Sequence, residues 1–141
     1  MTPLDDATVA YILETRKCFE DLRHVAAQLA GLLVLEASGA RSELPYHPML
    51  AAAEELYRGA EQQIQRASVS ARAERHHRHL AEAASAVGQA LRAAHQSPAV
   101  DPILVPLRAA YAHLQSTAGE LPGFEMVALG QGCCGPIRRN A

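Results

Sequence analysis

Apolar side chains recur along the first third of the chain at alternating steps of three and four residues. The main series is Ile12, Thr15, Phe19, Leu22, Ala26, Leu29 and Leu33, and a neighbouring row (Cys18, Leu22, Val25, Leu29 and Leu32) widens it. Because an α-helix has about 3.6 residues per turn, this spacing lays one apolar stripe along a helix. We expect a helix from about Asp5 to Ser38, closed by a glycine cap at Gly39 and central to the core.

Three later segments show the same rhythm. The first begins at Pro48 and continues to Ala67, and the second ends at Ser97 and Pro98. The third has Asp101 as its predicted N-cap and Pro102 as its first helical residue, and it ends near Gly119. The first two of these stripes are out of phase across residues 66–70, although no Gly, Pro, Asn or Asp marks a turn there. An unbroken helix would be about 70 Å long, so we expect a break with Ser68 or Ser70 as the N-cap.

The pattern therefore predicts an all-α fold, a small up-and-down bundle of four helices over residues 1–123. Residues 124–141 form an irregular tail that contains glycines and cysteines, and its first part (Phe124, Met126, Val127 and Leu129) is apolar enough to pack on the bundle. A length of 141 residues suits one domain. Apolar residues make up 49% of the chain and aromatic residues only 4%, which favours alanine-lined helices that pack closely.

Charge and hydropathy narrow the environment of the protein. The net charge of −2 argues against a general attraction to nucleic acid or anionic lipid. The most apolar run, residues 25–35, is too short to span a bilayer, and residues 1–6 lack the basic start of a signal peptide. We expect a cytoplasmic protein with no membrane or nucleic-acid partner. Arg outnumbers Lys twelve to one, which we attribute to the base composition of a bacterial genome.

The adjacent thiols Cys133 and Cys134 are the most unusual local feature. Neighbouring thiolates bind soft metal ions together, and they also oxidise to a strained disulfide that is readily reduced. The pair resembles the vicinal-cysteine C-terminus of mercuric reductases, and the resemblance covers only Cys133, Cys134 and Gly135. It implies transfer of a soft metal ion. Zinc-type CxxC spacing is absent, and the alternative is a pair of small loop residues.

A second candidate is the histidine cluster at residues 76–79. His76 and His77 flank the apolar stripe of the third helix, and His113 flanks that of the fourth. A metal site formed by facing helices would therefore join His76 or His77 to His113 and a cysteine. The alternative is a solvated, weakly basic helix face. A di-iron carboxylate site needs two Glu-x-x-His pairs, and only Glu74 with His77 offers one.

These features lead to a ranked expectation of function. First comes a non-enzymatic bundle that binds a soft transition metal ion or senses thiol redox state through Cys133 and Cys134, assisted by His76, His77 and His113. The second is a structural or interaction protein that acts as a homo-oligomer or with a protein partner. The third is an enzyme or a bundle with a small-ligand pocket between its helices. Cys18 belongs to the apolar stripe and is expected to be a core residue.

Overall fold

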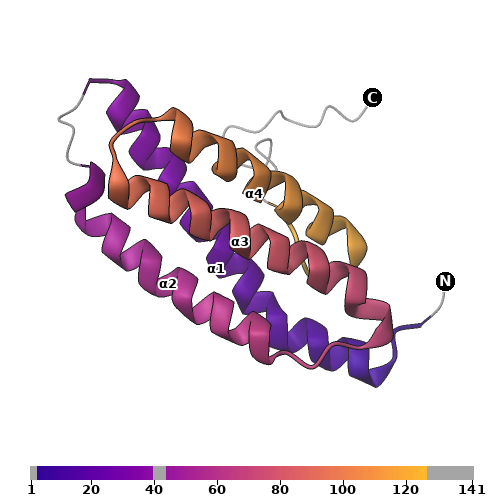
Figure 1. The fold of residues 1–141 in the computed structure, drawn as a ribbon. Coiled ribbons are helices and arrows are strands. Elements are labelled where there is room, and N and C mark those ends of the chain that lie inside the picture. The colour runs from indigo at the N-terminus through magenta and orange to yellow at the C-terminus, as the bar shows by residue number, and fades with distance from the viewer. Residues whose placement is uncertain (1–2, 40–43, 127–141) are drawn as a thin grey trace, which may run out of the picture.

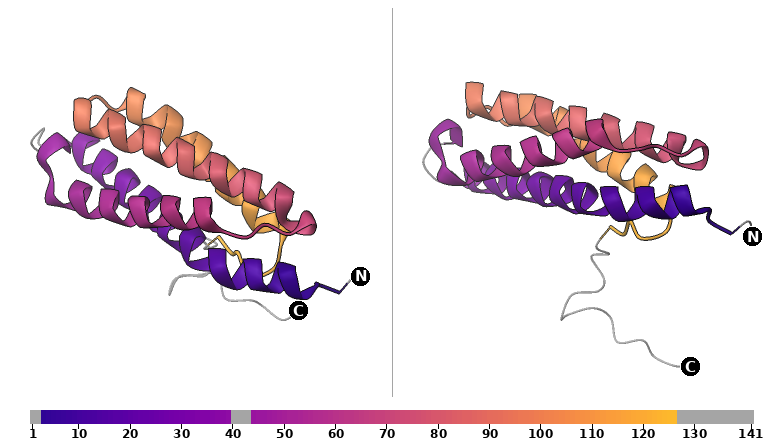
Figure 2. Two further views of the ribbon diagram at one scale, coloured as in Figure 1. Left: turned by 60° about the horizontal axis from the view of Figure 1, so that its bottom comes forward. Right: turned by 90° about the horizontal axis from the view of Figure 1, so that it is seen from below.

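The computed structural model describes residues 3–39 and 44–126, which form a bundle of four long helices (Figure 1). Their bounds are α1 Asp6–Ala37, α2 Pro48–Arg66, α3 Glu74–Gln96 and α4 Asp101–Glu120; short 3-10 turns η1 (Leu44–Tyr46) and η2 (Ala71–Ala73) precede α2 and α3. Successive helices run in opposite directions, as both further views in Figure 2 also show. The predicted all-α, up-and-down bundle is confirmed.

Helix α1 lies one residue inside its predicted bounds at each end, with Asp5 as its N-cap and Ser38 as its C-cap. The Asp5 carboxylate accepts a hydrogen bond from the backbone N–H of Thr8 at 2.9 Å, which satisfies one of the free donors of the first turn. At the other end Gly39 adopts a positive φ of 80°, and its N–H donates to the carbonyl of Glu36. A side chain at this backbone conformation would be strained, so the glycine stops the helix.

The core lies along the predicted stripes. All residues of both apolar rows of α1 are buried, and α2 contributes Leu50, Ala53, Ala60 and Ile64. Helix α3 adds mainly alanines together with Leu80, Val87 and Leu91, while α4 adds Ile103, Leu107, Ala110 and Leu114. Small alanine side chains on α3 let the helix axes approach closely, which gives a dense interior despite the low aromatic content.

The chain breaks between α2 and α3, as the phase shift predicts. Contacts with α1 hold this connection: the Glu14 carboxylate accepts a 3.4 Å hydrogen bond from the backbone N–H of Ser68, and the hydroxyl of Thr8 pairs with that of Ser70 at 2.8 Å. Ser70 precedes η2 but makes no side-chain capping bond, and Ala73 occupies the N-cap position of α3. The serine hydroxyl is therefore used for a contact to α1 and not for capping.

The last helix differs from its predicted bounds by one residue at each end. Asp101 is already helical and Val100 holds the N-cap position, whereas Gly119 lies inside the helix and Glu120 ends it. Pro106 sits within the second turn and lacks the N–H that would bond to the preceding turn. None of the described helices combines the length and the apolar character needed to cross a membrane.

The chain after α4 returns to the bundle. Gly123, with a φ of 92°, turns it, and the buried ring of Phe124 packs edge-on against Phe19 with ring centroids 5.5 Å apart. Arg23 then donates to the backbone carbonyl of Glu125 at 2.8 Å. The first residues of the segment defined above as the tail thus pack on α1.

Candidate metal centre

Of the five residues predicted to hold a metal ion, three lie in the described part of the chain. Cys133 and Cys134 fall outside it, so their expected roles stay predictions. His76, His77 and His113 are described, and each occupies a distinct environment in the bundle.

His76 lies in the core between α1 and the segment after α4. Its side chain is 1% exposed, its Nδ1 atom is 2.8 Å from the Tyr11 hydroxyl, and its ring packs on Phe124 with centroids 4.1 Å apart. Its Nε2 atom is buried and has no hydrogen-bond partner. Burial, with smaller contributions from His77 and His79, lowers the pKa of His76 to about 4. The ring is therefore neutral near pH 7 and acts as a core side chain.

His77 lies beside the same tyrosine. Its Nδ1 atom is 3.4 Å from the Tyr11 hydroxyl, and partial burial lowers the pKa of its ring. The tyrosine hydroxyl has one proton to donate and lone pairs that accept, so it can bond to both rings, with the roles set by the tautomers of the two histidines. These two histidines thus link α3 to α1 and point away from the partner predicted for them on α4.

His113 instead meets two residues of α3 that follow the buried pair. Its Nδ1 atom is 3.1 Å from Oε2 of Glu82, and the same carboxylate oxygen is 3.8 Å from Nδ1 of His79. One possible ligand atom from each of these three side chains lies within 4.8 Å of the others, and no further group of this kind converges among the described residues. The structure therefore brings together His79, Glu82 and His113, and not His76 or His77 with His113.

Helix geometry explains why His79, and not His76, meets His113. Residues three apart on a helix differ in direction by about 60°, so His76 and His79 share one side of α3 but face different neighbours. His76 points at Tyr11 of α1, while His79 points at α4, with ring centroids of His79 and His113 6.4 Å apart. Glu82 follows one turn later on the same side as His79 and completes the set.

The three ligand atoms have spacings close to those of a metal site. With metal–ligand bonds of about 2.0–2.1 Å, the donors around a tetrahedral ion are about 3.3 Å apart. The observed 3.1 Å and 3.8 Å to the Glu82 oxygen bracket this value, and the ligand atoms of His79 and His113 lie within 4.8 Å of each other. The Nδ1 atom of His79, which faces the carboxylate, is buried and lacks a hydrogen-bond partner. An incoming cation would give this buried nitrogen a partner.

The donor set and its exposure indicate the chemistry. Two imidazoles and one carboxylate suit borderline divalent ions such as zinc, and the same set occurs in zinc sites that keep an open coordination position. The side chains of His79, His113 and Glu82 are 24%, 35% and 47% exposed. Water or an outside ligand therefore reaches the site directly, and an ion has an entry path.

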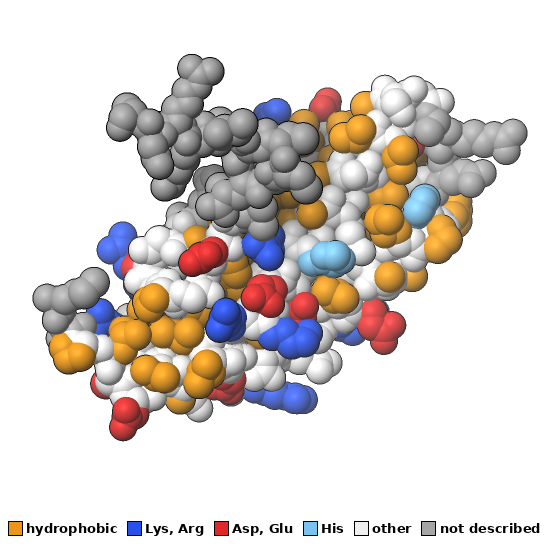
Figure 3. All heavy atoms as spheres, turned by 180° about the vertical axis from the view of Figure 1, so that it is seen from behind, with side chains coloured by type: hydrophobic (Ala, Val, Ile, Leu, Met, Phe, Trp, Pro, Cys, Tyr) orange, Lys and Arg blue, Asp and Glu red, His pale blue; other side chains and the backbone are white. Residues whose placement is uncertain are grey.

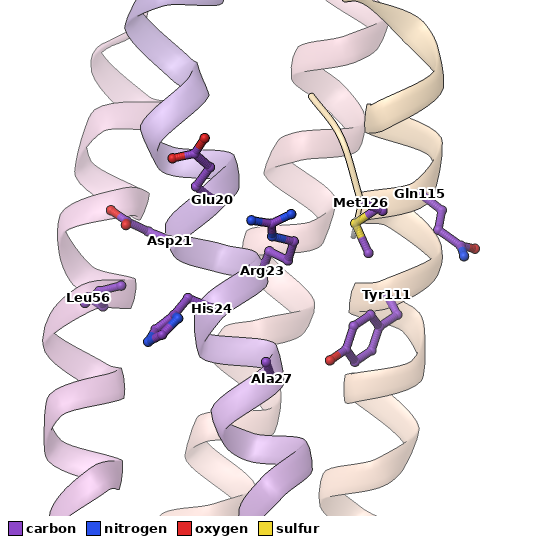
Figure 4. A pocket seen from close by; sticks show the side chains of 9 residues that line it. All are labelled: Glu20, Asp21, Arg23, His24, Ala27, Leu56, Tyr111, Gln115 and Met126. Atoms are coloured by element: carbon purple, nitrogen blue, oxygen red, sulfur yellow. The ribbon is translucent and has the colours of Figure 1, made fainter. Parts of the chain in front are cut away.

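A groove across the outer face of α1 is the alternative binding site. It has a volume of about 920 Å³ and lies between Leu56 of α2 and Tyr111 of α4, as Figure 4 shows. Two of its charged side chains are already engaged, because Asp21 accepts from Lys17 at 2.6 Å and Arg23 binds the carbonyl of Glu125. On the face of the bundle that Figure 3 shows, charged side chains lie across the middle and apolar side chains lie toward the ends. The groove also exposes Glu20, His24 and Gln115, but among the described residues the three ligand atoms that converge closely are those of His79, Glu82 and His113.

The third cysteine takes no part in the candidate centre. Cys18 is 2% exposed within α1, as its place in the stripe predicts, and burial raises the pKa of its thiol to about 11. A thiol in this state is neither a nucleophile nor a ready metal ligand.

Sequence reasoning missed Glu82 and ranked His79 below its neighbours. The available signal was the pair His79-x-x-Glu82, in which two ligand side chains three residues apart share a helix face. Their convergence with His113 depends on the register between α3 and α4, which the tertiary structure sets.

Comparisons with known proteins do not identify a family for this chain. A comparison of the chain with protein-family models, with curated proteins and with solved structures finds no significant match.

Proposed function

We propose that this bundle is a metal-binding protein that holds a divalent transition metal ion between α3 and α4. The observation that carries the proposal is the convergence of His79, Glu82 and His113, with one ligand atom each within 4.8 Å. The buried Nδ1 atom of His79 supports it, because that atom has no hydrogen-bond partner and would gain a partner from a bound ion. The mixed nitrogen and oxygen donors favour zinc, cobalt or nickel over magnesium or calcium.

The proposed site between α3 and α4 binds a different class of metal ion from the site expected at Cys133 and Cys134. Two thiolates select soft ions, whereas imidazole and carboxylate select borderline ones. Both sites are compatible with one protein, so the test must separate them. A homo-oligomer remains a second expectation from the sequence.

The test is calorimetric titration of the untagged, metal-free chain with zinc. We compare the wild type with His113→Ala, with a variant in which both tail cysteines are serine, and with His24→Ala. His24 is an exposed histidine of α1 and serves as the matched control. Circular dichroism verifies that each variant keeps its helical content.

The proposal expects one zinc ion per chain in the wild type, in the cysteine variant and in the control. His113→Ala should weaken binding by more than about tenfold, because removing a ligand costs more than removing an outer contact. Loss of binding in the cysteine variant with full binding in His113→Ala would assign the metal to the tail and overturn the site between the helices. No binding by the wild type would also overturn it.

A further inference from the structure

The last residue of α4 lies beside the proposed metal site. The Oε1 atom of Glu120 is 3.1 Å from Nε of Arg75 and 3.9 Å from Nε2 of His79. The Glu120 side chain is 28% exposed, while that of Arg75 is 75% exposed. The arginine thus fixes a carboxylate against the imidazole from the solvent side.

His79 therefore lies between two carboxylates that face opposite atoms of its ring. Nδ1 faces Glu82, which shares the site, and Nε2 faces Glu120, which lies outside it. A neutral imidazole carries its proton on one nitrogen only, so binding a cation through Nδ1 requires the proton on Nε2. That N–H then needs an acceptor, and a carboxylate is the strongest available.

We propose that Glu120 is a positioning residue for the metal site: its carboxylate accepts a hydrogen bond from the Nε2–H of His79 and so fixes the tautomer that presents Nδ1 to the ion. This inference rests on the proposed function. Carboxylate–histidine–metal chains of this kind orient the ring and raise the basicity of the ligand nitrogen. The present 3.9 Å separation closes to a hydrogen bond with a movement of about 1 Å, within the reach of rotations of two partly exposed side chains.

The test compares Glu120→Ala and Glu120→Gln with Glu125→Ala. Glu125 is exposed, carries the same charge and contacts Arg23 through its backbone carbonyl, so it is the matched control. Zinc titration should show affinity lowered about 10–100-fold in Glu120→Ala. The loss should be smaller in Glu120→Gln, because the amide oxygen still accepts, and absent in Glu125→Ala.

Nitrogen-15 NMR of the histidine rings gives a readout that a merely structural role would not move. In the metal-free wild type at pH 8, His79 should carry its proton on Nε2, and Glu120→Ala should shift the ring toward the Nδ1–H form that faces Glu82. Equal zinc affinity in Glu120→Ala and Glu125→Ala, or an unchanged tautomer, would overturn this inference. A wild type that binds no zinc would overturn the proposed function instead, while the metal-free spectra would still decide the role of Glu120.

Discussion

Acidification should destabilise the fold through His76. The ring is 1% exposed, is packed by Phe124, and faces the titratable groups of Tyr11, His77 and His79. Among the described residues no acid faces it to stabilise a charged imidazolium, so burial holds its pKa near 4 in the folded chain, against 6.5 for an ordinary histidine.

The magnitude follows from linkage. Between pH 6.5 and about 4, His76 is protonated in the unfolded chain but neutral in the folded chain. The free energy of unfolding therefore falls as the pH drops through this window. Above pH 6.5 His76 is neutral in both states, so the free energy of unfolding loses nothing to its protonation. Each pH unit between the two pKa values is worth about 1.4 kcal/mol, which gives a total loss of about 3 kcal/mol. Such a loss is a large share of the stability of a small domain.

The assay is urea unfolding followed by circular dichroism from pH 4 to pH 8 in the presence of a chelator. His76→Asn is the comparison, because the asparagine oxygen can accept from Tyr11 but does not titrate. The two proteins share every other titratable group, so the difference between their pH profiles reports on His76. Parallel profiles, within about 0.5 kcal/mol across the window, would refute the reasoning.

Three further results should follow from the same packing. With residues 133–134 replaced by serine, the native protein should show no reactive thiol and one after denaturation, because Cys18 is buried and its pKa is raised to about 11; a fast native reaction would contradict this. Leu29→Ala should cost about 2–5 kcal/mol in urea unfolding, whereas Leu13→Ala, at a position 68% exposed, should change stability by less than about 0.5 kcal/mol. Tyr11→Phe should cost about 1–3 kcal/mol, because it leaves Nδ1 of the buried histidine unsatisfied; an unchanged unfolding midpoint would argue against that hydrogen bond.

The fold was predictable because it depends on periodicity. The three–four spacing of apolar positions in α1 identified both the helix and the face that it buries, and the phase shift near residue 68 located the break between α2 and α3. Helix ends were predictable where a side chain caps its own backbone, as Asp5 does. They shifted by a residue where the predicted cap makes no such bond, as at Asp101.

The candidate site was only half predictable. His113 was identified because it flanks an apolar stripe, but its partners depend on how α3 and α4 pair, which periodicity does not determine. The sequence offered three clustered histidines of similar merit. A rotation of about 60° between His76 and His79 decides which of them is a core side chain and which meets α4.

All ligands of the proposed centre belong to one helical hairpin, because α3 and α4 are joined by only the residues between Gln96 and Asp101. Contacts so near in sequence cost little chain entropy to close, so an ion would clamp this hairpin without help from α1 or α2. Metal should therefore slow amide hydrogen exchange in α3 and α4 while leaving local opening of α2 unchanged. The bundle would then consist of a metal-controlled half and a half whose stability depends on packing alone.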